Sequence, residues 1–226
     1  MTYSLLGRCA RTGQFGAVVT TSAVGVGARV PFAKAGVGAV LTQHRTDPRL
    51  GPLGLELLSR GFTARQTIDA IVAATPHRDW RQLAAIDAQG RTAHFDGANV
   101  KAAISVAHGR DCVGAGNILR NEHVAPAMVA SFEATADLPL ATRLVRAIQT
   151  GEDAGGETAA VVSACLLVVD TESFPFVDLR VDAHDRPLEE LARLWALYEP
   201  TAADYVRRAV DPDFAATYIA PPPKPV

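Results

Sequence analysis

The chain has 226 residues, with 22 lysines and arginines against 24 aspartates and glutamates, which gives a formal net charge of −2. Hydrophobic residues make up 48% and charged residues 20%, which excludes a disordered chain and indicates one large or two small globular domains. The balanced charge argues against a nucleic-acid-binding protein, which normally carries a basic excess.

The first half of the chain predicts four strands followed by two helices. The strands are expected at residues 3–8, 15–20, 24–30 and 36–43. Residues 53–60 have helical spacing and stop at Gly61, a normal residue after a helix end. Thr63, with Gln66 three residues later, predicts a capping box at the start of a second helix.

The second half repeats this succession. Strands are expected at residues 82–88, 91–95, 102–107, 111–115, 158–170 and 174–182. Gln89-Gly90 indicates a hairpin turn between the first two of them. Helices are expected after Asn121, over 138–150, and from Pro187 to about Tyr198, the last one capped by Asp185.

Helices that arrive in pairs argue against a doubly wound parallel sheet, in which one helix follows each strand. The order instead favours an α+β fold, a four-layer α-β-β-α sandwich with two mainly antiparallel sheets. This succession is that of the N-terminal-nucleophile (Ntn) hydrolases. We expect a single domain over residues 1–210 and a proline-rich tail over 211–226.

The N-terminus and the cysteines indicate a cytoplasmic protein. No cationic region followed by a long apolar one begins the chain, so no secretory signal is predicted. The longest apolar run, residues 159–169, is shorter than the ~20 residues of a membrane-spanning helix. Cys9, Cys112 and Cys165 are widely spaced, which predicts neither a disulfide framework nor a zinc site.

Several glycine-rich and polar segments resemble a bacterial family known as domain of unknown function 1028. They are residues 16–19, 24–25, 30–31, 36–43, 51–58, 116–119, 154–156 and 179–184, in the expected order. The resemblance implies an Ntn-hydrolase-like fold and no established reaction. One departure concerns residues 157–163, which keep Glu157 and Ser163 but lack the Arg and Gln of the usual Arg-Gly-x-Gln-Ser run.

An Ntn hydrolase uses a Thr, Ser or Cys whose own α-amine acts as the base. Thr2 follows the initiator methionine, and its small size permits removal of Met1. Lys34 is the candidate electrostatic helper, at an interval similar to that of proteasome-type subunits. The acidic residue expected at the end of the second strand is absent, and Thr20-Thr21-Ser22 stands there instead. Alternatively, Thr2 is an ordinary residue of the first strand.

Three polar residues are candidates for substrate binding. Thr42 and Gln43 end a predicted strand, where side chains commonly line a cleft, and Gln43 can donate a hydrogen bond to a carbonyl. Asn117 follows two glycines and can stabilise an oxyanion. The alternatives are a solvated strand end for Gln43 and a left-handed turn for Asn117.

Other constellations predict less. Asp182 and His184 suggest metal ligands, but they lie before a helix where Asp is a routine cap, so neither metal nor cofactor is expected.

The first functional hypothesis is a hydrolase of a small amide or related C–N bond. The second is a catalytically inactive member of the fold that binds a metabolite or acts as an oligomeric scaffold. Expected partners are a small molecule and further copies of the chain, without nucleic acid or membrane.

Overall fold

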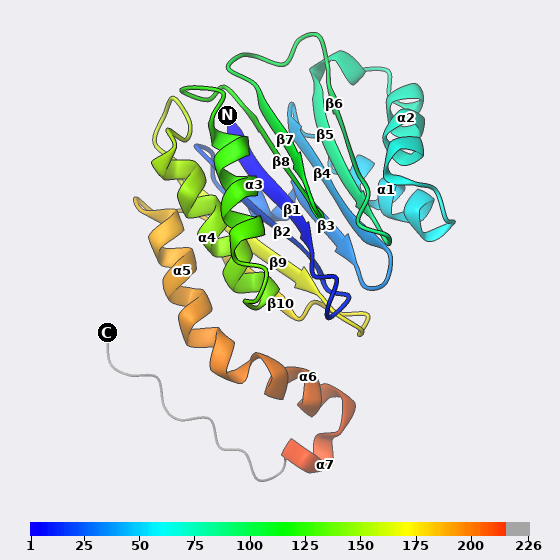
Figure 1. The fold of residues 1–226 in the computed structure, drawn as a ribbon, viewed down its shortest axis with the longest axis vertical. Coiled ribbons are helices and arrows are strands. Elements are labelled where there is room, and N and C mark those ends of the chain that lie inside the picture. The colour runs from blue at the N-terminus through cyan, green and yellow to red at the C-terminus, as the bar shows by residue number, and fades with distance from the viewer. Residues whose placement is uncertain (216–226) are drawn as a thin grey trace.

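The computed structural model describes residues 1–215, and within them ten strands form two antiparallel sheets (Figure 1). The larger sheet has the order β10-β9-β2-β1-β8-β7. Its strands are β1 (Thr2–Arg8), β2 (Phe15–Thr21), β7 (Ser105–Gly109), β8 (Cys112–Asn117), β9 (Ser163–Val169) and β10 (Val177–Val181). The N-terminal strand β1 therefore lies in the interior of this sheet, between β2 and β8.

The smaller sheet has the order β3-β4-β5-β6. Its strands are β3 (Pro31–Lys34), β4 (Gly38–His44), β5 (Arg81–Asp87) and β6 (Thr92–Asp96). The two sheets pack face to face through a layer of small and branched apolar side chains, among them Leu6, Val19, Leu41 and Ile86. Alanines and valines dominate this layer, which allows two sheets to approach closely.

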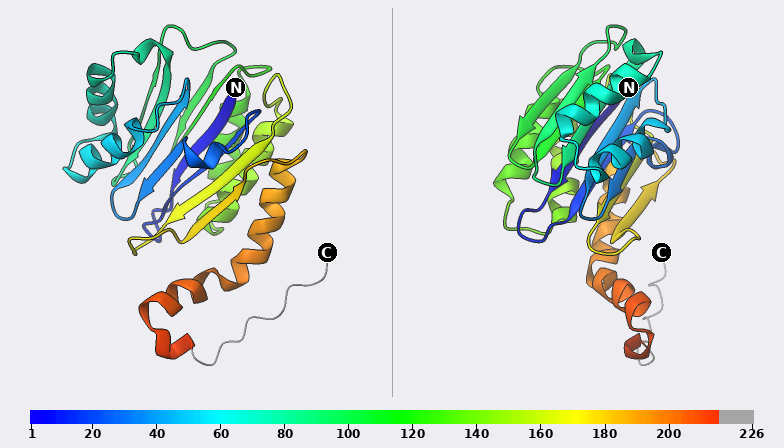
Figure 2. Two further views of the ribbon diagram at one scale, coloured as in Figure 1. Left: turned by 180° about the vertical axis from the view of Figure 1, so that it is seen from behind. Right: turned by 90° about the vertical axis from the view of Figure 1, so that its right-hand side faces the viewer.

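Helix pairs cover both outer faces of the sandwich (Figures 1 and 2). On the smaller sheet lie α1 (Leu50–Ser59) and α2 (Ala64–Ala74), and on the larger one α3 (Val124–Ala134) and α4 (Leu140–Asp153) with α5 (Pro187–Tyr198). Short 3-10 turns occur at η1 (Val26–Ala28), η2 (Arg78–Trp80) and η3 (Glu199–Thr201). The predicted four-layer α-β-β-α fold with two antiparallel sheets is confirmed.

Beyond α5, the chain leaves the sandwich as a helical arm. The arm consists of α6 (Ala202–Val210) and α7 (Pro212–Ala215), which extend away from both sheets in Figures 1 and 2. Helix α7 falls inside the predicted tail of residues 211–226, and the remainder of that tail, 216–226, lies outside the described residues.

The strand predicted over residues 24–30 was wrong. Gly25 adopts a left-handed backbone with φ 65°, and the next three residues form η1. Pro31, expected to end a strand, begins β3 instead. Because β3 is an edge strand, a proline at its first position costs no ladder hydrogen bond. The alternation of valine and glycine therefore reflects a tight turn.

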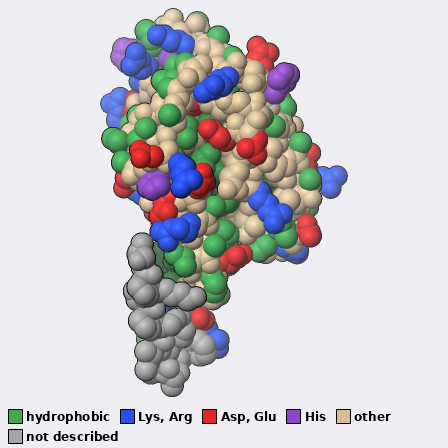
Figure 3. Space-filling view, turned by 90° about the vertical axis from the view of Figure 1, so that its left-hand side faces the viewer, with side chains coloured by type: hydrophobic (Ala, Val, Ile, Leu, Met, Phe, Trp, Pro, Cys, Tyr) green, Lys and Arg blue, Asp and Glu red, His purple; other side chains and the backbone are tan. Residues whose placement is uncertain are grey.

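Charges are interspersed over the surface, in keeping with the small net charge. In Figure 3, acidic and basic side chains alternate over the face turned to the viewer. No helix in the described part of the chain is long and apolar enough to cross a membrane.

Candidate functional site

At one end of the sandwich, the layer between the sheets changes from apolar to polar. Because side chains two residues apart on a strand share a face, the residues of each strand that face the other sheet can be traced toward this end of the sandwich. The series are Leu6, Ser4 and Thr2 on β1, Leu41 and Gln43 on β4, Ile86, Ala84 and Gln82 on β5, and Val113, Ala115 and Asn117 on β8. The polar ends of four strands therefore meet between the two sheets.

These side chains form one buried hydrogen-bonded network. Ser4 Oγ donates to Gln43 Oε1 at 2.8 Å, and Gln43 Nε2 donates to Gln82 Oε1 at 2.6 Å. Asn117 Nδ2 donates to the same Gln82 oxygen at 2.8 Å. All four residues are at most 1% exposed. The network therefore joins the two sheets through amide side chains where the rest of the layer is hydrocarbon.

Gln82 is the centre of this network, because its two polar atoms together have four hydrogen-bond partners. Its Nε2 donates to Asp96 Oδ1 at 2.8 Å and to the Gly116 carbonyl at 3.0 Å. Asn117 Oδ1, in contrast, is buried and has no hydrogen-bond partner among the residues that the structure describes. An unsatisfied buried acceptor is costly and uncommon, so Asn117 has spare hydrogen-bonding capacity directed into this end of the sandwich.

Thr2 lies next to this network at the start of β1, where it is paired in register with Asn117 on β8. Thr2 is only 6% exposed. Its Oγ1 is 3.3 Å from Thr21 Oγ1, and both hydroxyls donate to the carbonyl of Met1. The first peptide of the chain is therefore held by two threonine hydroxyls at the polar end of the sandwich.

A buried carboxylate reaches the same place from a distant part of the chain. Glu157 Oε2 accepts a hydrogen bond from Ser22 N at 3.1 Å, directly after β2. Glu157 is 2% exposed, and its Oε1 is buried without a hydrogen-bond partner within residues 1–215. Burial raises the pKa of this carboxyl to about 7, against the opposing effects of Ser22 and the N-terminal charge. Glu157 therefore places a carboxyl group beside the end of β2, where the sequence itself has Thr20-Thr21-Ser22 and no acidic residue.

The N-terminal amine belongs to this cluster electrostatically. Burial lowers the pKa of the Met1 amine below its usual value, Glu157 opposes the shift, and Arg45 adds to it. Burial also lowers the pKa of His44, and the charges of the N-terminus, Arg45 and Lys101 contribute to the shift. Burial at this end of the sandwich therefore favours the neutral form of the N-terminal amine.

Of the three strands that carry the amide side chains, β4 and β8 lead into residues with left-handed backbones. His44, after Gln43, has φ 68°, and Ile118, after Asn117, has φ 56°. For a β-branched residue such as isoleucine this conformation is strained by about 1–3 kcal/mol. Backbone hydrogen bonds to Lys101 and Thr158 hold Ile118 in place. Such strain clusters at functional sites, which supports the assignment of this end as the site.

Comparison with models of known protein families shows to which family this chain belongs. Residues 2–191 match the model of the "Family of unknown function (DUF1028)". The chain belongs to the DUF1028 family. No protein with a curated description matches it.

A solved structure of the same family agrees with this membership. The crystal structure of protein SPO2555 from Silicibacter pomeroyi, itself described as DUF1028, is similar with a TM-score of 0.83 and 29% identity, over 92% of this chain and 94% of that one. Anbu (ancestral beta-subunit) from Yersinia bercovieri matches with a TM-score of 0.40 and 10% identity, over 91% of this chain and 97% of that one.

The structure of this DUF1028 protein does not bring all the predicted site residues together. Gln43 and Asn117 meet through Gln82, and Thr2 adjoins them. Lys34 is exposed on the edge strand β3, paired in register with Gly38, and its Nζ donates to Ser59 Oγ at 3.2 Å. Gly38 lies at the opposite end of β4 from Gln43, roughly 17 Å away along the strand.

Thr42 points away from the network. Its hydroxyl donates to the Asp47 carbonyl at 3.3 Å and accepts from Asp47 N at 3.4 Å. These bonds stabilise the loop after β4. The left-handed turn considered for Asn117 belongs to the following residue, Ile118, and Asn117 itself is the last residue of β8.

Four residues of the DUF1028 site were not predicted from the sequence: Ser4, Thr21, Gln82 and Glu157. Ser4 and Gln82 have a signal in the period of two, since each is a polar residue in line with apolar ones on a buried strand. Glu157 has no local signal, because only the tertiary fold brings it to Ser22.

No metal centre is formed by the described residues, 1–215. Within them, no group of three or more His, Cys, Asp or Glu side chains is placed to hold a metal ion. The segment before α5 is organised by backbone contacts: His184 Nδ1 accepts from Arg186 N at 3.0 Å, and Asp185 does not cap the helix.

Proposed function

We propose that this DUF1028 protein hydrolyses a small amide or related C–N bond, with Thr2 as the nucleophile after removal of Met1. One observation carries the proposal. The N-terminal residues, the Thr21 hydroxyl and the buried Glu157 carboxyl lie together at the polar end of a four-layer sandwich. Burial at this end disfavours the charged forms of the Met1 amine and the Glu157 carboxyl, and we infer the same direction for an amine freed on Thr2.

The chemistry follows from a free amine on Thr2. Thr2 Oγ1 attacks the carbonyl carbon of the substrate, and the hydroxyl proton passes to the Thr2 α-amine. Collapse of the tetrahedral intermediate breaks the C–N bond, and the α-ammonium returns the proton to the leaving nitrogen. Water, deprotonated by the same amine, then attacks the threonine ester. Collapse of the resulting second tetrahedral intermediate releases the carboxylic acid and restores the Thr2 hydroxyl, so the reaction requires no cofactor.

The surrounding groups have distinct parts in this proposal. Thr21, 3.3 Å from the Thr2 hydroxyl, orients the nucleophile. Glu157, whose Oε1 has no partner, accepts a hydrogen bond from the new α-amine and thereby orients it. Asn117 is the residue of the amide network nearest in register to Thr2, and it binds the substrate through its unsatisfied oxygen. Lys34 has no part, because it lies at the far end of β4.

The test begins with the mass of the intact protein, which shows whether Met1 is removed. The purified protein is then assayed for ammonia or amine release against a panel of small amides. Thr2→Ala should lower any activity by about 1,000-fold or more, whereas Thr2→Ser should retain a measurable part of it. Unchanged activity in Thr2→Ala, or full retention of Met1 in an active protein, would contradict the proposal.

The second candidate is a catalytically inactive, metabolite-binding member of the fold. The observation in its favour is that Met1 lies over Thr2, with its carbonyl held by both threonine hydroxyls. Retention of Met1, together with a ligand that raises the melting temperature and is never turned over, would favour this candidate.

We also propose that the chain forms homo-oligomers. The glycine- and alanine-rich strands β1 and β2 are not free to pair with another copy, because both of their edges are occupied within the larger sheet. The support comes from exposed apolar side chains at the end of α5 and in the arm, where Leu197, Tyr205 and Val210 are 64%, 44% and 61% exposed. Sedimentation that shows only monomer at micromolar concentration would refute self-association.

A further inference from the structure

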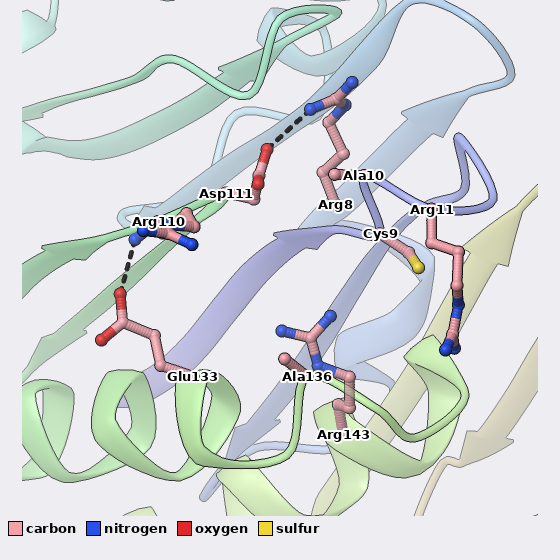
Figure 4. Close-up of a pocket in the computed structure, with 9 residues that line it drawn as sticks. All are labelled: Arg8, Cys9, Ala10, Arg11, Arg110, Asp111, Glu133, Ala136 and Arg143. Atoms are coloured by element: carbon pink, nitrogen blue, oxygen red, sulfur yellow. Dashed lines mark hydrogen bonds and ion pairs between the residues drawn. The ribbon is translucent and has the colours of Figure 1, made fainter.

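A polar cavity of about 430 Å³ lies at the opposite end of β1 from Thr2. It is formed where the end of β1 and the β7–β8 turn meet the connection between α3 and α4 (Figure 4). Strand β1 is seven residues long, so the cavity is roughly 20 Å from the candidate catalytic site. The two sites therefore share a strand and no side chains.

The side chains around this cavity carry an excess of positive charge. Four arginines line it, Arg8, Arg11, Arg110 and Arg143, against two carboxylates, Asp111 and Glu133. Arg8 Nη1 forms an ion pair with Asp111 at 2.7 Å, and Glu133 accepts from the backbone nitrogen of Arg110 at 2.6 Å. Among residues 1–215, no carboxylate lies within ion-pair distance of the other three guanidinium groups.

Arg143 is the unusual member of this group, because it is only 6% exposed. Its Nε and Nη2 donate to the Phe132 carbonyl at 3.2 and 3.0 Å, and its guanidinium lies over the Phe132 ring. These contacts satisfy part of the guanidinium and supply no negative charge, although the carbonyl belongs to the negative end of α3. In Figure 4, the guanidinium points from α4 into the cavity. A buried cation without a counterion is costly unless an anion joins it.

Cys9 lies on the wall of the cavity, close to the arginines (Figure 4). Burial raises the pKa of its thiol, but hydrogen bonds with Thr12 and Arg11 and the charge of Arg11 reverse the shift, and the net direction is downward. Cys9 is itself buried, at 2% exposed, as are Cys112 and Cys165, whose pKa burial raises to about 12. The hydrogen bonds around Cys9 therefore set its thiol apart from the other two.

We propose that this cavity binds a small oxyanion, a phosphate or carboxylate group, held by Arg143 from within and by Arg11 and Arg110 from the rim. Guanidinium groups recognise both kinds of group through charge-assisted, bidentate hydrogen bonds. The volume accommodates a small metabolite. The proposal does not depend on catalysis at Thr2.

The experiment is isothermal titration of the full-length protein at constant ionic strength, with inorganic phosphate in one arm and succinate in the other. Saturable binding in either arm is expected and identifies the group. Arg11→Ala and Arg110→Ala change exposed side chains, and each should weaken binding about tenfold. The matched control is Arg60→Ala, which removes an exposed arginine paired with Glu56 far from the cavity and should leave binding unchanged.

Thermal unfolding gives an independent readout. The anion that binds should raise the melting temperature of the wild type, and Arg11→Ala should reduce that rise. Thr2→Ala should bind the anion like the wild type, which separates this site from the proposed catalytic one. Absence of saturable binding of both anions at about 10 mM, or equal weakening by Arg60→Ala, would overturn the proposal.

Discussion

The two ends of strand β1 are both polar, yet they differ in charge. At the Thr2 end, an amide network surrounds an amine and a carboxylate whose charged forms are both disfavoured by burial. At the Arg8 end, guanidinium groups stay charged regardless of burial because their pKa is intrinsically high. One end therefore suits proton transfer and the other suits attraction of an anion.

This difference shows how one strand can serve two chemistries. The apolar middle of the sandwich, including Leu6 and Val19, fixes the distance between the ends and keeps both rigid. The polar groups at each end then need only be held in place. Three substitutions test this contrast between the two ends of β1. Their expected effects on the free energy of unfolding decrease in the order in which they are given.

The largest effect is expected from Gln82→Leu, at the neutral end. The change leaves donors of Gln43 and Asn117 and the carbonyl of Gly116 without a partner inside the sandwich. The free energy of unfolding should fall by about 3–4 kcal/mol in urea titrations. The control is Gln89→Leu in an exposed turn, which should change it by about 0.5 kcal/mol or less. Equal losses in both variants would show that the network is not structural.

A smaller, pH-dependent effect is expected from Glu157→Gln. The folded-state pKa of Glu157, about 7, exceeds its ordinary value of 4.5. Wild-type stability from this group is therefore complete below pH ~4.5 and is lost as the pH rises through ~7. Relative to Glu157→Gln, the wild type should lose up to about 3 kcal/mol between pH 4.5 and pH 8. Urea unfolding at several pH values measures this, and parallel profiles would contradict it.

At the cationic end, Arg143→Met should lower the free energy of unfolding by about 2 kcal/mol. The change removes charged hydrogen bonds to the Phe132 carbonyl and the contact with its ring. Arg11→Ala, at the exposed rim, should cost about 0.5 kcal/mol or less. Thermal unfolding with and without phosphate provides the comparison. A more stable Arg143→Met variant would show that the desolvation of the charge outweighs its contacts.

Local patterns in the sequence predicted the elements that local physics controls. The capping box of α2 is present, with Gln66 N donating to Thr63 Oγ1 at 3.2 Å and Thr63 N to Gln66 Oε1 at 3.0 Å. Paired helices and alternating strands also predicted the layers. The turn at residues 24–30 was missed because valine and glycine in alternation imitate a strand until a left-handed glycine interrupts it.

The site was predictable only where strand periodicity led into it. Gln43 and Asn117 stand at strand ends, and the structure joins them through Gln82. The interval between Thr2 and Lys34 in the sequence indicated that Lys34 belongs to the site. In the structure the β3–β4 hairpin pairs Lys34 with Gly38, at the other end of the sheet. Glu157 could not be found locally, since its contact with Ser22 spans 135 residues.

The interior position of β1 has a consequence for biosynthesis. The β1–β2 hairpin is translated first, but its outer edges pair with β8 and β9, which end at Asn117 and Val169. Until those segments leave the ribosome, the hairpin exposes two open edges with apolar side chains, a known hazard for aggregation. The central sheet therefore cannot close until the segment up to Val169 has been synthesised, and such non-local pairing makes folding slow.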